Sequence, residues 1–208
     1  MEIYKYLKYV LRGKASQGDF IFEQKNTGLL FNREKYEAII SDNNILELYD
    51  MISDGFKIQW YTDDSRAIGG QMEFPEMKHV LGSWQGILFE EEDLQRNPHL
   101  KYYKALDLIS EQHTVGFLHG ADFEANSLYC HISPYSDLYS LDLDFEGYMQ
   151  MAFEAKIYYY WPKVLLDIQS NLESKETQDF KENMPKLFED FSWDDFVKKY
   201  ESLRLSKQ

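Results

Sequence analysis

The chain of 208 residues contains a single cysteine, Cys130, and no apolar run that approaches the roughly 20 residues needed to cross a bilayer. One cysteine excludes an intrachain disulfide and is typical of a reducing compartment. The N-terminal sequence MEIYKYLKYVLRGKA lacks the uninterrupted apolar stretch of a signal peptide, because Lys5 and Lys8 interrupt it. We therefore expect a cytoplasmic protein that does not bind membranes.

Sequence motifs of catalysis are also missing. The chain has no Walker loop, dinucleotide fingerprint, nucleophile elbow or H-E-x-x-H zinc signature. Its five histidines are scattered rather than spaced as metal ligands: His79, His99, His113, His119 and His131. Cys130 and His131 are neighbours in a predicted strand and would face opposite sides of it, so we interpret Cys130 as a small core hydrophobe. We expect no metal, no cofactor and no enzymatic activity. An enzyme that uses carboxylates from residues 42–93 and 122–146 is the alternative.

Positive charge is scarce, since 22 Lys and Arg residues stand against 36 Asp and Glu residues, a formal charge of −14. Such a charge opposes non-specific binding to nucleic acid. Residues 42–93 carry much of it, because they contain 12 acids and three bases. One interpretation is a solvated face, and the other is a docking surface for a protein partner with a basic surface. The candidate partner-binding acids are Asp63, Asp64, Glu90, Glu91, Glu92 and Asp93.

Aromatic residues are abundant, with 16 Tyr, 14 Phe and 4 Trp. They suit both cores and recognition surfaces, so each tryptophan is judged by its surroundings. Trp60 alternates with Phe56 and Ile58, and Trp161 precedes Pro162, which places both in the core. Trp84 lies between two glycines, at 82 and 86, and is the candidate recognition aromatic, with a packing role as the alternative.

Residues 113–168 organise the predicted fold. Residues 114–118 are a β-branched and aromatic run, and apolar and polar residues alternate with period two over 127–132 and 138–143. With a turn-rich segment at 120–126, this pattern predicts three antiparallel strands. The period then changes to that of a helix, with Asp144 as its cap and Phe145, Tyr148, Met149 and Ala152 on the buried face. A meander followed by an amphipathic helix indicates an α+β fold.

The remaining pattern predicts helices at 2–12, 33–40 and 45–52, and strands at 56–61, 68–74 and 84–89. Residues 20–22 and 29–31 form a predicted hairpin around a polar turn. A helix is expected to begin at Pro162, and Ser192 to cap a last helix that Pro185 separates from an earlier helical segment. We expect a single domain over residues 1–208. Its core spans 36–168, an N-terminal helix and hairpin occupy 1–35, and a helical extension occupies 169–208.

Three stretches resemble the SUKH superfamily, the Smi/Knr-type cell-wall regulators and bacterial immunity proteins. They are LYDMISDGFKIQWY (48–61), IGGQMEFPEMKHVLGSWQG (68–86) and LYSLDLDFEGYMQMAFEAKIYYYW (138–161). The Leu-Pro pair usual before the second helix of the family is absent, and SDNNILELY (41–49) stands in its place.

The resemblance implies an antiparallel sheet of about five to six strands with helices packed on one side, here followed by extra C-terminal helices. It also implies a non-catalytic protein-binding module. Many bacterial members bind and neutralise a cognate toxin, often a nuclease, and a fungal branch acts in cell-wall synthesis and signalling. The predicted function is that of an immunity protein, and a cytoplasmic regulatory or scaffold protein is the alternative.

Overall fold

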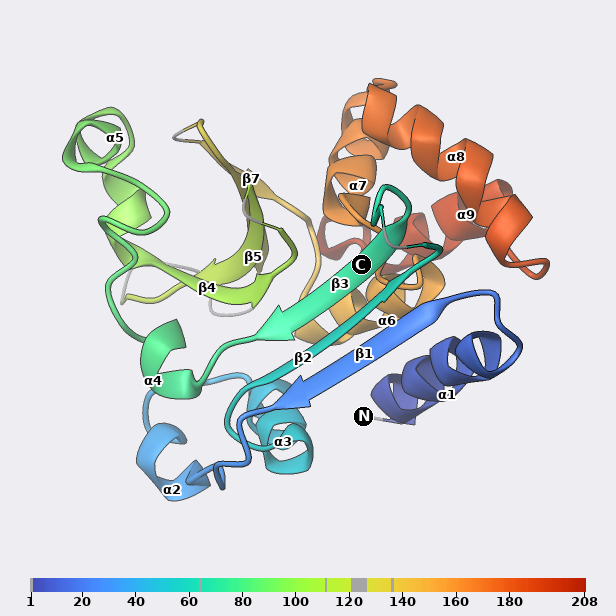
Figure 1. The fold of residues 1–208 in the computed structure, drawn as a ribbon. Helices are drawn as coiled ribbons and strands as arrows, with labels where there is room; N and C mark the ends of the chain where they lie inside the picture. Colours follow the sequence, from blue (N-terminus) through green and yellow to red (C-terminus); the bar gives the residue numbers. More distant parts are fainter. Residues whose placement is uncertain (1, 64, 111, 121–126, 136) are drawn as a thin grey trace.

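The structure, a computed structural model, describes residues 2–63, 65–110, 112–120, 127–135 and 137–208. It is an α+β fold whose strands form two antiparallel sheets rather than the single sheet expected (Figure 1). The first sheet has the order β1 (Ile21–Asn26), β2 (Phe56–Tyr61), β3 (Gly69–Phe74). The second has the order β4 (Tyr103–Leu108), β5 (His113–Leu118), β6 (Leu128–Ile132), β7 (Leu138–Ser140).

The two sheets meet where β3 lies beside β4, and side chains take the place of a backbone ladder there. The Glu73 backbone N–H donates to Asp107 Oδ1 at 2.8 Å, and Gln71 Nε2 donates to the Leu108 carbonyl at 2.8 Å. The pairing of β4 with β5 shifts between Ala105 and Asp107, as at a β-bulge. A single sheet was the wrong expectation because a buried carboxylate interrupts the ladder at this junction.

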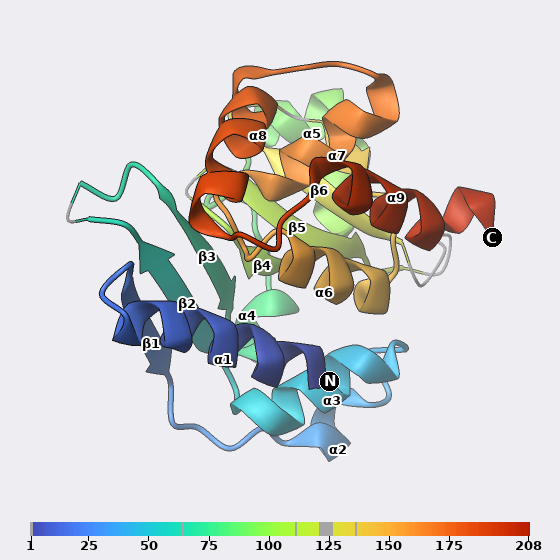
Figure 2. The same ribbon diagram turned by 90° about the vertical axis from the view of Figure 1, so that its right-hand side faces the viewer.

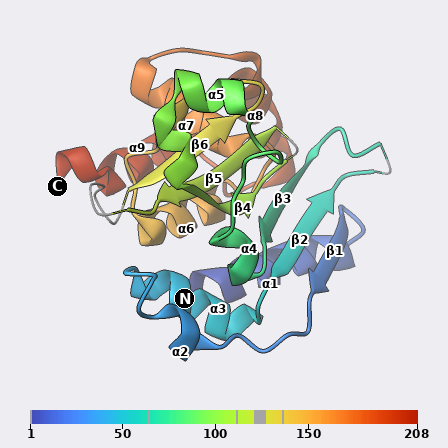
Figure 3. The same ribbon diagram turned by 90° about the vertical axis from the view of Figure 1, so that its left-hand side faces the viewer.

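The longer helices gather on one side of the sheets, whereas two short ones lie on the opposite side. Figure 2 shows the side of the longer helices, which carries α1 (Glu2–Ser16), α6 (Phe145–Glu154), α7 (Trp161–Ser170), α8 (Lys175–Leu187) and α9 (Trp193–Leu203). Figure 3 shows the opposite side, where α4 (Met77–Val80) and α5 (Glu91–Arg96) lie in front and no helix lies over much of β2 and β3. The short elements α2 (Arg33–Tyr36), α3 (Asn43–Ile52), η1 (Pro98–Tyr102) and η2 (Leu205–Lys207) complete the described chain. No described helix is long and apolar enough to cross a bilayer.

Local signals that depend on one short stretch are confirmed. Asp144 caps α6, its Oδ1 accepting from the Gly147 N–H at 2.7 Å, and Ser192 caps α9 in the same way through the Asp195 N–H. Helix α7 begins at Trp161, one residue before the proline expected to start it. Trp60 and Trp161 are fully buried in the main core.

Several predicted elements are wrong. Residues 29–31 are in no strand, and β1 pairs with β2 instead of forming a hairpin. Residues 84–89 form a turn closed by a single bridge between Gln85 and Phe89. The helix expected over 33–40 ends at Tyr36, the strand expected over 138–143 ends at Ser140, and Pro185 lies inside α8. Strand β4 and helix α5 were not predicted, and residues 121–126 of the expected turn lie outside the described residues.

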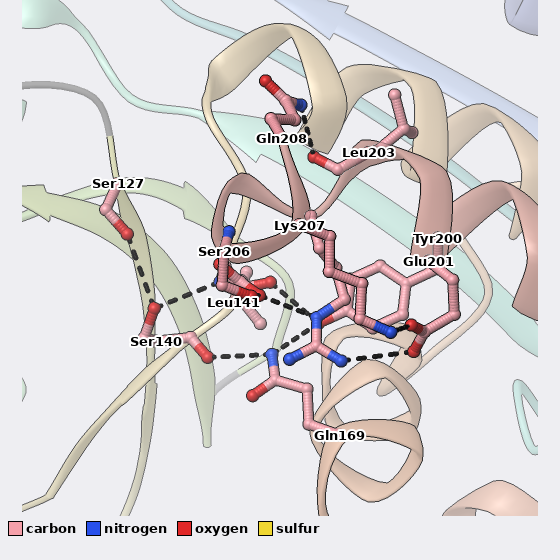
Figure 4. A network of polar contacts seen from close by, with 12 residues as sticks. Ser127, Ser140, Leu141, Gln169, Tyr200, Glu201, Leu203, Ser206, Lys207 and Gln208 are labelled. Atoms are coloured by element: carbon pink, nitrogen blue, oxygen red, sulfur yellow. Dashed lines mark hydrogen bonds and ion pairs between the residues drawn. The ribbon is translucent and has the colours of Figure 1, made fainter.

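The C-terminal extension is bonded to the loop between β7 and α6. Tyr200 donates its hydroxyl hydrogen to the Leu141 carbonyl at 2.9 Å, and the Ser206 N–H donates to Asp142 Oδ1 at 2.9 Å. Arg204 Nε donates to Asp142 Oδ2 at 2.7 Å. Figure 4 shows the side chains of this network converging from α9, η2 and the end of β7. These bonds hold the extension against the loop between β7 and α6.

Candidate functional site

The uncovered face of the first sheet consists of polar side chains in cross-strand rows. Because Phe56, Ile58 and Trp60 point into the core, the alternate residues of β2 point to the opposite face. The strand register aligns Lys25, Lys57 and Glu73 in one row across the three strands. The same register aligns Glu23, Gln59 and Gln71 in the next row.

One end of this face is a cavity of about 570 Å³, which we call the α4 cavity. Its apolar lining comes from the ends of three strands and from the turn after α4. Trp84 is buried with 6% of its surface exposed, whereas Ile87 at the cavity wall is 70% exposed. The lining apolar residues are Phe56, Phe74, Pro75, Trp84, Ile87 and Leu108.

Hydrogen bonds from buried or half-buried side chains fix the walls of the α4 cavity. Asp54 Oδ1 accepts from the Met77 N–H at 2.6 Å, and the Tyr49 hydroxyl donates to the Pro75 carbonyl at 2.7 Å. Lys104 Nζ donates to the carbonyls of Leu81 and Gly82, at 3.1 and 2.8 Å. Both ends of α4 are therefore held by groups from distant parts of the chain.

A second cavity of about 730 Å³ adjoins the first and shares Lys57, Glu73 and Leu108 with it. Its far end is lined by Arg66, Tyr159 and Tyr160. We call the two cavities together the groove. Arg66 lies over the ring of Tyr61, 4.5 Å from the guanidinium carbon to the ring centroid, and 3.6 Å from a Glu23 carboxylate oxygen.

The charges that line the groove differ in sign from the charge of the whole protein. Four cationic side chains (Lys25, Lys57, Arg66 and Lys78) accompany two carboxylates (Glu73 and Glu76). Lys57 pairs with Glu73 at 2.8 Å and Lys78 with Glu76 at 2.6 Å. The hydrogen bond from Lys78 lowers the pKa of the Glu76 carboxyl. The groove is locally basic although the chain is strongly acidic.

The predicted partner-binding acids lie at two separate places on the rim of this region rather than in one patch. Asp63 is exposed in the turn between β2 and β3, where the Ser65 hydroxyl and N–H donate to its carboxylate and lower its pKa. Asp64 lies outside the described residues. The turn and α5 are well apart in Figure 1, because α5 lies beyond β4.

The other four predicted acids begin α5. Glu90, Glu91 and Glu92 are exposed, and Asp93 is half-buried. The Glu90 N–H donates to Asp93 Oδ2 at 2.9 Å, which caps the helix, and Gln85 Nε2 donates to Glu91 Oε2 at 2.9 Å. Trp84, proposed as a recognition aromatic, instead packs in the smaller core, and its Nε1 donates to the Val80 carbonyl at 3.1 Å. Ile87, which sequence reasoning did not single out, is the exposed apolar side chain there.

Acids that are close in the sequence are dispersed in space. Asp50 pairs with Arg33 at 2.6 Å on α3, and Asp54 is buried beneath α4. Glu73 and Glu76 are paired with lysines inside the groove. The excess of acid in residues 42–93 therefore does not form a single acidic face.

Buried titratable groups serve packing rather than line the groove. Cys130 is fully buried on the core side of β6, as predicted, and burial raises the pKa of its thiol to about 12. His131 is also buried, and burial lowers its pKa. Among the residues that the structure describes, no group of three or more His, Cys, Asp or Glu side chains is arranged to hold a metal ion.

Comparisons with known proteins identify no relative. No protein-family model matches the chain. A search of curated proteins and a search of solved structures also return no match. The resemblance to the SUKH superfamily thus stays a prediction that depends on the three stretches quoted above.

Proposed function

We propose that this protein is a non-catalytic, cytoplasmic binding module, an immunity protein that neutralises a cognate toxin by direct contact through the groove and its rim. The observation that carries the proposal is the uncovered polar face of the first sheet with two adjoining cavities, beside helices that cover the other side. Concave, mixed polar and apolar surfaces with fixed walls suit recognition of another molecule.

The rigidity of the groove supports binding. Its walls are held by Asp54, Tyr49 and Lys104, whose polar atoms bond backbone groups of the turns around α4. A surface that is ordered before association loses less conformational entropy when a partner docks. Ile87 adds an apolar side chain, 70% exposed, at this end of the sheet.

The acidic rim has a different role from the groove. Glu90, Glu91 and Glu92 stand together at the start of α5, outside the cavities. Clustered like charges at the edge of an interface accelerate the encounter with an oppositely charged partner more than they strengthen the final complex. A toxin with a basic surface, such as a nuclease, fits this arrangement.

The test is a rescue assay. The full chain is co-expressed with the toxin domain encoded beside its gene, survival is scored, and the affinity of the purified pair is measured by calorimetry. Rescue with tight binding is the expected result. If the neighbouring gene product neither binds nor is neutralised, and loss of this protein alters growth without any toxin, the regulatory or scaffold function replaces the proposal.

A further inference from the structure

We infer that the groove takes a segment of the protein partner that carries a carboxylate next to an apolar side chain. This inference rests on the proposed function and names the chemistry that the groove itself selects. The partner therefore presents two features: a basic surface for the α5 rim and an acidic segment for the groove. Charge complementarity is the first argument, because the groove lining is cationic in a protein with a formal charge of −14.

The strongest local argument is the pair formed by Lys25 and Lys57. The register places these two lysines directly opposite each other on neighbouring strands, so their side chains share the open face. Like charges in that position disfavour strand pairing. Lys57 is compensated by Glu73 on its other side, at 2.8 Å. Lys25 forms no ion pair within 4 Å among the residues that the structure describes, and its charge acts only as a minor cause of the lowered pKa of Glu23. An anion placed between the two lysines would relieve the repulsion.

The acids nearest to this position already have partners. Glu23, in the next row of the open face, accepts from the Tyr61 hydroxyl at 2.6 Å and lies 3.6 Å from Arg66. Glu73 and Glu76 are the carboxylates of the α4 cavity, and each already has a lysine within 2.8 Å. Lys78 and His79 stand on the α4 side of the same cavity, and both are exposed. A partner carboxylate would thus meet cationic groups on both walls, and the two carboxylates there are already paired with lysines.

Ile87 at the wall of the α4 cavity accounts for the apolar half of the ligand. It is 70% exposed, whereas Trp84 is 6% exposed and Phe74 packs into the main core. A volume of about 570 Å³ exceeds that of one side chain, so a short stretch of chain fits with its apolar side chain against Ile87. Arg66, at the far end of the second cavity, offers a further cation to a longer segment.

The experiment is a selection of random dodecapeptides displayed on phage against the immobilised full-length protein, followed by titration of a selected synthetic peptide. We expect enrichment of Asp or Glu beside Leu, Ile or Phe. Amide shifts in ¹⁵N-labelled protein should fall on β1, β2, β3 and α4. Enrichment of Lys or Arg, or no enrichment of either charge, overturns the inference. Binding of single-stranded RNA that is lost in the Lys25→Glu variant would also overturn the inference.

Matched variants separate charge from folding. Lys25→Glu is expected to weaken peptide affinity by about tenfold or more, because like-charge contacts across an interface are costly, and Lys25→Met by less. Lys175→Glu places the same change on exposed α8, on the helical side, and should leave affinity unchanged. Equal affinity of Lys25→Glu and wild type, with both folded by circular dichroism, contradicts the inference.

The two proposals fail separately. If the Lys25→Glu variant still rescues cells from the toxin and no acidic peptide is selected, the immunity function stands and the proposed ligand of the groove is wrong. Selection of acidic peptides that depend on Lys25, without rescue by the neighbouring toxin, would keep the groove chemistry and remove the immunity function.

Discussion

The hydroxyl of Tyr148 donates a hydrogen bond to Asp107 Oδ2 at 2.6 Å, and both residues are fully buried. The other oxygen of this carboxylate accepts from the Glu73 N–H of the neighbouring sheet. Asp107 therefore joins β3, β4 and α6 at the junction between the two sheets. Burial raises its pKa to about 7, although both hydrogen bonds favour the ionised form.

The raised pKa of Asp107 predicts a dependence of stability on pH. Between about pH 4 and pH 7 the folded state holds a proton that the unfolded state has lost, so the free energy of unfolding falls as pH rises, by at most about 1.4 kcal/mol per unit. Asp107→Asn is expected to remove this contribution. Urea unfolding of both proteins at half-unit steps from pH 4 to pH 8 measures it.

His113 contributes with the opposite sign and makes the comparison with the variant necessary. Burial lowers its pKa to about 4, so its contribution to the free energy of unfolding is lost as pH falls from about 6.5 to 4. The prediction concerns the difference in free energy of unfolding between wild type and Asp107→Asn. The contribution of His113 is the same in both proteins and cancels in this difference. Asp179→Asn on exposed α8 is the control. If the difference in free energy of unfolding between wild type and Asp107→Asn does not change with pH, the raised pKa of Asp107 is contradicted.

Gly70 is predicted to tolerate no side chain. A Cβ built there would lie 2.2 Å from the Ile157 carbonyl oxygen and 2.7 Å from Trp60 Nε1, because the segment after α6 packs directly on β3. Gly70→Ala should lower the free energy of unfolding by about 3 kcal/mol. The measurement is urea denaturation of the purified variant.

Gly13 provides the matched control for Gly70. It lies in α1, and a Cβ there would meet nothing within 4 Å. Gly13→Ala should stabilise the protein by about 0.5–1 kcal/mol through the higher helix propensity of alanine. Equal effects of the two substitutions would show that the close approach of Ile157 to β3 is wrong.

Elements whose sequence pattern lies within a few neighbouring residues could be predicted, and elements that depend on a distant partner could not. Helix α6 and its cap needed only Asp144 and a periodic apolar face, both within a few residues. Strand β1 was misassigned because Glu23 and Lys25 suit a polar loop, and its partner β2 lies 30 or more residues away. Strand β4 was missed, and its buried Asp107 is a residue type depleted in strands.

The groove was beyond sequence reasoning for a related reason. Lys25, Lys57, Lys78 and Leu108 come from four separate segments, and only the register of the first sheet and the junction with β4 bring them together. Acid density along the chain was a poor guide, since Glu73 and Glu76 are neutralised by lysines and Asp54 is buried. The acids at the start of α5 are exposed, and their role in docking stays a prediction.

Arg204 is predicted to anchor the C-terminal extension. Its side chain is 19% exposed and pairs with Asp142 at 2.7 Å and with Glu201 at 3.2 Å. Arg204→Ala leaves both carboxylates without this partner and should cost about 2 kcal/mol of unfolding free energy. Arg96→Ala removes an arginine that is 71% exposed on α5 and should change stability by less than about 0.5 kcal/mol. Equal melting temperatures for the two variants would show that the extension is not anchored by this pair.

The role of the α5 rim is tested by reversing its charge. The double variant Glu91→Lys and Glu92→Lys is expected to slow association with the toxin by about tenfold at low salt, with the effect shrinking as salt is added, because exposed charges act mainly on the encounter rate. Asp194→Lys and Asp195→Lys make the same change in the first turn of α9, on the helical side, where both acids are also exposed.

Asp63→Lys alters the other end of the region, and its effect on the association rate should add to that of the α5 pair because the sites are far apart. Stopped-flow association rates distinguish the variants. An identical slowing by the α5 and α9 pairs would mean that only the net charge of the protein matters, whereas a slowing confined to α5 would assign the rim to the docking face.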